Sequence, residues 1–121
     1  MRILGFSKKW DKLQRGEFTT FRFKRKDHDW NVGEVVQIVY KPRSKDRGIL
    51  GVAEIINLEP RSVAPYTLGG PSNLDVSHRE AVEDGFENVV EMVEWFEKTY
   101  GEERLTQEVM NKLTLRWVGR E

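Results

Sequence analysis

Three polar residues near the N-terminus have the types and spacing needed to bind an anion. Thr20, Arg22 and Lys24 occupy every second position, so a β-strand would place them on one face. A guanidinium held on a strand can form two parallel hydrogen bonds to a phosphate or to a base edge. We therefore expect this face to contact an anionic ligand. The alternative is that Arg22 pairs with an acidic neighbour, such as Asp84 or Glu54, for structure alone.

Basic residues are concentrated in the first part of the chain. Residues 1–47 carry 13 Lys and Arg against 6 Asp and Glu, a net charge of +7, whereas residues 48–121 carry 7 against 14, a net charge of −7. Clustered cations bind phosphates through counterion release. We expect nucleic-acid contacts from six loop residues: Arg25, Lys26, Lys41, Arg43, Lys45 and Arg47. The alternative is that the two halves simply attract each other within one fold.

Three aromatic residues could supply rings on which unpaired bases stack, namely Trp30, Tyr40 and Tyr66. The alternative is that these rings belong to the core. Trp10, Trp95 and Trp117 are expected to pack in the core.

Carboxylates and histidines offer fewer chemical possibilities. Glu17 and Asp84 are candidate carboxylates for general acid–base catalysis, which requires burial or charged neighbours to shift the pKa. His28 lies between two aspartates, but cysteine is absent and there is no clear third ligand. We therefore expect a charged loop at His28, no metal site and no cofactor.

The composition indicates a single globular domain spanning residues 1–121, of which 38% are apolar and 33% charged. No apolar run approaches the roughly 20 residues that cross a bilayer. We expect a cytoplasmic protein that does not bind membranes, and a monomer.

Hydrophobic periodicity predicts mixed α and β structure in the order β-α-β-β-β-α-α-β. The segment 17–24 alternates polar and apolar residues, which predicts a half-buried strand. Ser77 and Asn88 each lie three residues before a glutamate, the spacing of helix caps. The expected strands are 2–6, 17–24, 34–40, 49–58 and 112–118, and the expected helical segments are 7–13, 77–84, 88–100 and 106–110.

Two further features of the expected elements are an apolar helix face and a long connection. The second long helix has an apolar stripe at spacings of three and four, formed by Val89, Met92, Val93, Phe96 and Tyr100. The connection 60–77 contains the sequence Gly69-Gly70-Pro71-Ser72, which we interpret as a flexible turn.

The sequence resembles the ASCH family, a branch of the PUA-like β-barrel superfamily. The stretch 16–22 (GEFTTFR) resembles the family's G-x-K-T-x-T-x-R motif, allowing one residue of difference in length. The turn at Val32-Gly33-Glu34, the Asp84-Gly85-Phe86 helix junction and the closing strand at 113–117 follow in the family's order. The resemblance implies an α+β fold with a small PUA-like mixed or antiparallel barrel flanked by two or three short helices.

The resemblance also implies a cleft between the early strand and the Asp84 junction. We expect Trp95 to line this cleft and the turn at residues 69–72 to cover it. PUA-like barrels typically bind RNA or modified nucleobases, and one ASCH branch is an amidohydrolase of acetylated cytidine that uses a lysine, a threonine and a glutamate. By position, the threonine corresponds to Thr20, the glutamate to Asp84 and the lysine to Glu17. Because a carboxylate cannot replace an amine, Lys12 or Lys24 would have to reach the cleft in its place.

We expect the protein to bind RNA or a nucleotide-like ligand in a cationic cleft. The expected ligand contacts are Thr20, Arg22, Lys24, Asp84 and Trp95. An alternative is a small amidohydrolase acting on modified nucleosides or RNA, with Thr20, Asp84 and Glu17 as catalytic candidates. A further alternative is protein binding through the acidic helix surface at residues 87–97.

Overall fold

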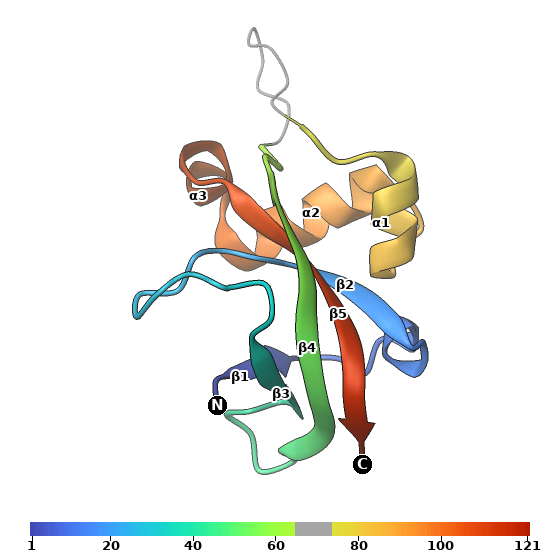
Figure 1. Cartoon of the computed structure of the whole chain (residues 1–121). Coiled ribbons are helices and arrows are strands. Elements are labelled where there is room, and N and C mark those ends of the chain that lie inside the picture. Colours follow the sequence, from blue (N-terminus) through green and yellow to red (C-terminus); the bar gives the residue numbers. More distant parts are fainter. Residues whose placement is uncertain (65–73) are drawn as a thin grey trace, which may run out of the picture.

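The computed structural model describes residues 1–64 and 74–121, which form a curled five-stranded sheet with three α-helices gathered at one end (Figure 1). Along the chain the elements are β1 (Ile3–Phe6), the 3-10 helix η1 (Asp11–Gln14), β2 (Glu17–Arg22), β3 (Val35–Tyr40), β4 (Gly48–Arg61), α1 (His78–Asp84), α2 (Val89–Tyr100), α3 (Glu102–Gln107) and β5 (Met110–Arg120). The expected α+β class is confirmed at this level. No helix in the described part of the chain is long and apolar enough to cross a membrane.

The strand order is β1-β3-β4-β5-β2, so the first two strands of the sequence form the two edges of the sheet. β1 pairs with β3 in parallel, and the other three pairings are antiparallel. The sheet is therefore mixed and shaped as a half-barrel, with its two edges turned towards each other.

Bulges in the long strand β4 produce the curl. The register with β5 shifts between Val52 and Ala53, and again between Ile55 and Asn57. Such irregularities bend a strand and increase its twist. Gly51 precedes the first bulge with φ of +146°, and a Cβ atom there would lie 2.3 Å from the carbonyl oxygen of Gly119. The close approach of the two backbones at this bend therefore requires glycine.

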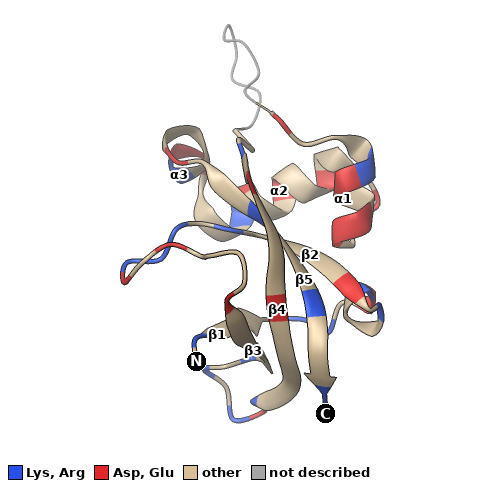
Figure 2. Ribbon diagram, viewed as in Figure 1, with Lys and Arg blue, Asp and Glu red and all other residues tan. Residues whose placement is uncertain are grey.

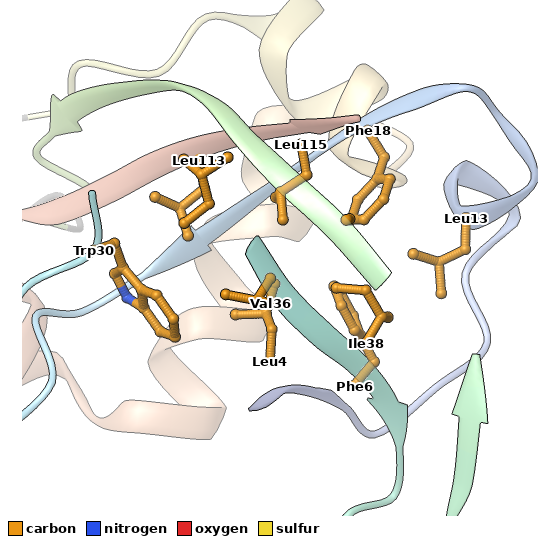
Figure 3. Packing of buried hydrophobic residues seen from close by; sticks show 11 residues of the cluster. Leu4, Phe6, Leu13, Phe18, Trp30, Val36, Ile38, Leu113 and Leu115 are labelled. Atoms are coloured by element: carbon orange, nitrogen blue, oxygen red, sulfur yellow. The ribbon is translucent and has the colours of Figure 1, made fainter. Parts of the chain in front are cut away.

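Two clusters of buried side chains hold the sheet and the helices together. The first fills the inside of the curl, where side chains such as Phe6, Ile38 and Leu115 point towards one another (Figure 3). The second lies between the sheet and the helices and includes Phe21 and Phe96. The core of the molecule is thus divided by the sheet, with one part on each side.

β2 contributes to both clusters, which corrects the expectation that it is half-buried. Phe18 packs inside the curl, whereas Phe21 packs under the helices. All four residues from Phe18 to Phe21 are buried. Since both faces of the strand are covered, its polar side chains Thr19 and Thr20 are buried as well.

The predicted helix caps are confirmed. The side chain of Ser77 accepts a hydrogen bond from the backbone N–H of Glu80, and that of Asn88 accepts one from Glu91. Met92 and Phe96 of the predicted stripe of α2 are fully or almost fully buried.

Element boundaries differ from the sequence-based expectation towards the C-terminus. The helix expected at 106–110 is α3, which ends at Gln107 and buries Leu105 completely. Met110 already belongs to β5, because it pairs with Arg61 at the extended end of β4. Tyr66 and the turn at residues 69–72 lie outside the described residues.

Candidate functional site

A cavity of about 200 Å³ lies between the edges of the curled sheet and the helices. We call it the aromatic cavity. Its walls come from the end of β1, from η1 and the segment before it, from β2, and from the helices α1 and α2 with the turn between them. The lining residues are Gly5, Phe6, Ser7, Trp10, Lys12, Thr20, Phe21, Arg22, Asp84, Phe86, Trp95, Phe96, Thr99 and Tyr100.

A buried ion pair lies on the polar side of this cavity. The Lys12 Nζ atom is 3.1 Å from Asp84 Oδ1, and the side chains of the two residues are 3% and 5% exposed. The Thr19 hydroxyl donates a hydrogen bond of 3.0 Å to the same Oδ1 atom. One carboxylate oxygen thus receives two donors, which compensates part of the cost of burying the charge.

Local backbone structure positions both Lys12 and Asp84. Lys12 lies in η1, whose one turn of 3-10 helix buries Lys12 and Leu13. Asp84 is the last residue of α1, and Gly85 ends the helix in the left-handed conformation with φ of +112°. A Cβ atom at Gly85 would lie 2.8 Å from Trp10 Cε3, so glycine also lets the Trp10 ring approach.

Burial pushes both groups of the pair towards their neutral forms. Desolvation lowers the pKa of Lys12 to about 8, although the charge of Asp84 opposes this shift. Desolvation likewise raises the pKa of Asp84, against the stabilising effect of Lys12 and Thr19. Near neutral pH, Lys12 therefore deprotonates more readily than an ordinary lysine and is closer to the range in which an amine acts as a base or a nucleophile.

A second polar group joins β2 to the opposite edge of the sheet. The Arg22 Nε atom donates to the Thr20 hydroxyl at 3.0 Å, and Nη2 donates to the carbonyl oxygen of Gly5 at 2.7 Å. The guanidinium also lies 4.7 Å from the centre of the Phe6 ring. These contacts fix Arg22 between β1 and β2, where it lines the cavity.

Aromatic rings form the remaining wall. The centre of the Trp10 ring is 5.1 Å from that of Phe86 and 5.4 Å from that of Trp95. Trp95 is 38% exposed, so part of its ring faces solvent at the cavity. This corrects the expectation that Trp95 belongs to the core and agrees with its expected place in a cleft.

A second, larger cavity of about 580 Å³ adjoins the first. The two cavities share Arg22 and Tyr100. Five cationic side chains and one carboxylate line the second cavity, which we call the cationic groove: Arg22, Lys24, Arg25, Lys26 and Arg104, with Asp27. Its floor includes Trp30, which is buried and whose Nε1 donates to the carbonyl oxygen of Phe23.

The two basic loops are separate segments of the ribbon (Figure 2), and their hydrogen bonds place them at opposite ends of β1. Arg25 donates a hydrogen bond to the carbonyl oxygen of Ile3, at the start of β1. The backbone N–H of Lys41 donates to the carbonyl oxygen of Phe6, at its end. The groove therefore receives its cations from residues 22–26 and Arg104, and the loop at residues 41–47 projects from the other end of the strand.

Ion pairing between the two halves of the chain neutralises little of their charge. Within the described residues, Lys12–Asp84 is the one ion pair that joins residues 1–47 to residues 48–121. The others lie within one half, as Arg2–Glu34 and Lys112–Glu80 do. Internal salt bridges thus do not account for the excess of positive charge in the first half.

The structure brings together four of the expected ligand contacts, since Thr20, Arg22, Asp84 and Trp95 all line the aromatic cavity. Lys24 lines the neighbouring groove instead. Glu17 is exposed at the start of β2, where it pairs in register with Arg116, and it is not among the residues that line either cavity.

Lys12, rather than Glu17, supplies a charged group next to Asp84, and Thr19 rather than Thr20 bonds to that carboxylate. Alternation along the strand indicates that Thr19 and Thr20 face opposite sides, but it does not reveal that both sides are covered. The sequence gives only a weak indication that Lys12 belongs to the site. It is a lysine within a short turn between the apolar residues Trp10 and Leu13.

Comparison with known proteins gave no match among protein-family models, curated proteins or solved structures. No group of three or more His, Asp or Glu side chains within residues 1–64 and 74–121 is arranged to hold a metal ion. The site is therefore described by its own geometry: a small aromatic cavity with a buried Lys–Asp pair, opening beside a cationic groove.

Proposed function

We propose that the protein binds RNA or a nucleotide-like ligand, with a base in the aromatic cavity and the phosphate backbone along the cationic groove. The observation that carries this proposal is the junction of the two cavities at Arg22 and Tyr100. A ligand that spans the junction has a flat apolar part on one side and negative charge on the other. Nucleotides combine these two properties.

The size of the aromatic cavity supports a single ring system. Its volume of about 200 Å³ is below the range of about 300–1,000 Å³ that is typical of sites for drug-sized molecules. Trp10, Phe86 and Trp95 offer ring faces, and Thr20 and Asp84 offer polar atoms that can contact the edge of a base. The residues thus combine stacking with hydrogen bonding.

Isothermal titration calorimetry with the four ribonucleotides and a short single-stranded RNA tests this proposal. Stacking on an aromatic side chain contributes about 1–3 kcal/mol per base. The change Trp95→Ala should therefore weaken binding by about 5- to 150-fold. Val90→Ala is the matched control, because Val90 is an exposed residue of the same helix that does not line the cavity. Absence of binding to the whole panel, or equal weakening by both changes, would contradict the proposal.

A second candidate function is hydrolysis of an amide on a modified nucleoside. The observation that favours it is the position of Lys12, which lines the cavity together with Thr20 and Asp84. The ASCH resemblance implies a lysine, a threonine and an acidic residue, and Lys12 supplies the amine that Glu17 lacks. The pKa of about 8 makes a neutral amine accessible near physiological pH.

Release of acetate from N4-acetylcytidine, followed with the purified protein, tests the second candidate. Thr20→Val and Asp84→Asn should each abolish turnover, whereas Thr106→Val, an exposed change on α3, should preserve it. If the wild-type protein fails to release acetate from the acetylated nucleoside and from an acetylated RNA, this function is excluded for that substrate class.

A further inference from the structure

Arg22 is a largely enclosed cation without an anionic partner. Its two side-chain hydrogen bonds within the described residues go to neutral oxygens, the hydroxyl of Thr20 and the carbonyl of Gly5. Among the described residues, no carboxylate forms an ion pair with its guanidinium, and its Nη1 atom has no hydrogen-bond partner. The expected alternative, a structural pair with Asp84 or Glu54, is therefore wrong.

The surroundings of Arg22 do not neutralise its charge. Asp84 is already bonded to Lys12 at 3.1 Å. Because this pair has no net charge, it does not neutralise the charge of Arg22. Desolvation lowers the pKa of Arg22, and the charged or titratable groups that act on it are Tyr100 and Asp84. Arg22 also acts on Lys12 as a like charge that lowers its pKa. A guanidinium that is partly shielded from solvent gains more from an external anion than a fully exposed one, because the interaction is less screened by water.

The position of Arg22 shows where such an anion would bind. Arg22 is shared by the aromatic cavity and the cationic groove. The groove continues from it with Lys24, Arg25 and Lys26. A phosphate next to Arg22 would thus lie beside a base in the cavity on one side and near further cations on the other.

We propose that Arg22 is the recognition residue for a phosphate at the junction of the two cavities, so that the ligand class is a phosphorylated nucleotide or RNA and not a free nucleoside or base. This inference rests on the proposed function and specifies its ligand. The free Nη1 donor, together with Nη2, presents a planar pair of nitrogens that matches the oxygens of a phosphate.

Calorimetry on the wild-type protein compares each of the four ribonucleosides with its 5′- and 3′-monophosphate. We expect the better monophosphate of each pair to bind at least 10-fold more tightly than its nucleoside. The change Arg22→Gln removes the charge but keeps donors for Gly5, and it should reduce this preference to less than about 3-fold. Arg22→Lys keeps the positive charge but lacks the planar pair of nitrogens, so it should retain part of the preference for the monophosphate. Arg116→Gln, an exposed change on the outside of β5, should leave the preference unchanged.

Inorganic phosphate, followed by the ³¹P chemical shift, separates the inference from the proposed function. A shift that saturates with wild-type protein and disappears in Arg22→Gln supports the phosphate site even if no nucleoside binds. Equal affinity for nucleosides and their monophosphates would overturn the inference and leave the base-binding function standing. Because Arg22 also bonds to Gly5 of β1, the far-UV circular dichroism of Arg22→Gln and Arg22→Lys is compared with that of the wild type. A phosphate preference that survives in a folded Arg22→Gln protein would also overturn the inference.

Discussion

At the scale of single residues, the buried Lys12–Asp84 pair leads to a prediction about the free energy of unfolding. Removing one member leaves the other as an uncompensated buried charge, which typically costs about 3–5 kcal/mol. We expect Lys12→Met to lower the free energy of unfolding by about that amount. The double change Lys12→Met/Asp84→Asn should be more stable than Lys12→Met alone, because no unpaired carboxylate then remains in the buried site. Urea denaturation of the wild type, Lys12→Met, Asp84→Asn and the double variant measures these differences.

The exposed pair Arg79–Glu83, one turn apart on α1, provides the control. Exposed ion pairs contribute about 0–1 kcal/mol, so Arg79→Met and Glu83→Gln should have small effects. Additive losses from Lys12→Met and Asp84→Asn would show that the two side chains stabilise the fold independently of each other.

At the scale of elements, Glu80 fastens α1 to the sheet and thereby helps to position Asp84. It bonds to Lys112 of β5 at 2.8 Å and to Arg61 of β4 at 3.2 Å. Burial works against ionisation of Glu80, but the hydrogen bonds from Lys112 and Ser77 and the charges of Lys112 and Arg61 lower its pKa to about 2. The folded state therefore holds the ionised carboxylate at pH values at which the unfolded chain binds a proton.

The sign of the resulting pH dependence follows from this lowered pKa. The stabilisation by Glu80 is fully present above the unfolded pKa of 4.5 and is lost as the pH falls towards 2. Glu80→Gln should remove this part of the acid sensitivity, so the stability difference from wild type should be largest above pH 4.5 and shrink below it. Thermal unfolding between pH 2 and 7 measures the effect, with Glu83→Gln as a control on the same helix. A constant difference across this range would contradict the prediction.

At the scale of the whole molecule, the two basic loops should contribute differently to RNA binding, because they lie at opposite ends of β1. Lys24→Glu/Lys26→Glu changes the charge of the cationic groove and should weaken binding of both a short and a long RNA. Suitable lengths are about 4 and about 16 nucleotides, the limits of the site sizes that are common for single-stranded nucleic acids. Arg43→Glu/Lys45→Glu/Arg47→Glu should weaken binding of the longer RNA alone.

Filter binding at several salt concentrations measures both effects. For a single strand, log K falls with log salt by about 0.7 for each phosphate that is neutralised, so each variant should show a shallower slope. Equal affinity of the wild type and both variants for the longer RNA would exclude these loops as its binding surface.

Local signals in the sequence predicted the elements well, but they predicted the site only in part. Capping by Ser77 and Asn88 and the stripe containing Met92 and Phe96 depend on neighbours within one helix, so pattern alone reveals them. The pairing of Lys12 with Asp84 joins residues that are 72 positions apart, and it depends on how η1 and α1 meet. The ASCH resemblance stays a hypothesis, since the half-barrel alone does not identify a PUA-like fold.

The distribution of tryptophan gives the protein a built-in optical reporter. Trp10 and Trp95 line the aromatic cavity, and Trp30 lines the cationic groove. The fourth, Trp117, lines neither of these cavities, and its Nε1 atom is buried without a hydrogen-bond partner among the described residues. Occupation of either cavity should therefore quench or shift the emission of particular indoles against a constant background from Trp117. Three single Trp→Phe variants would show, without any label on the ligand, which cavity fills first.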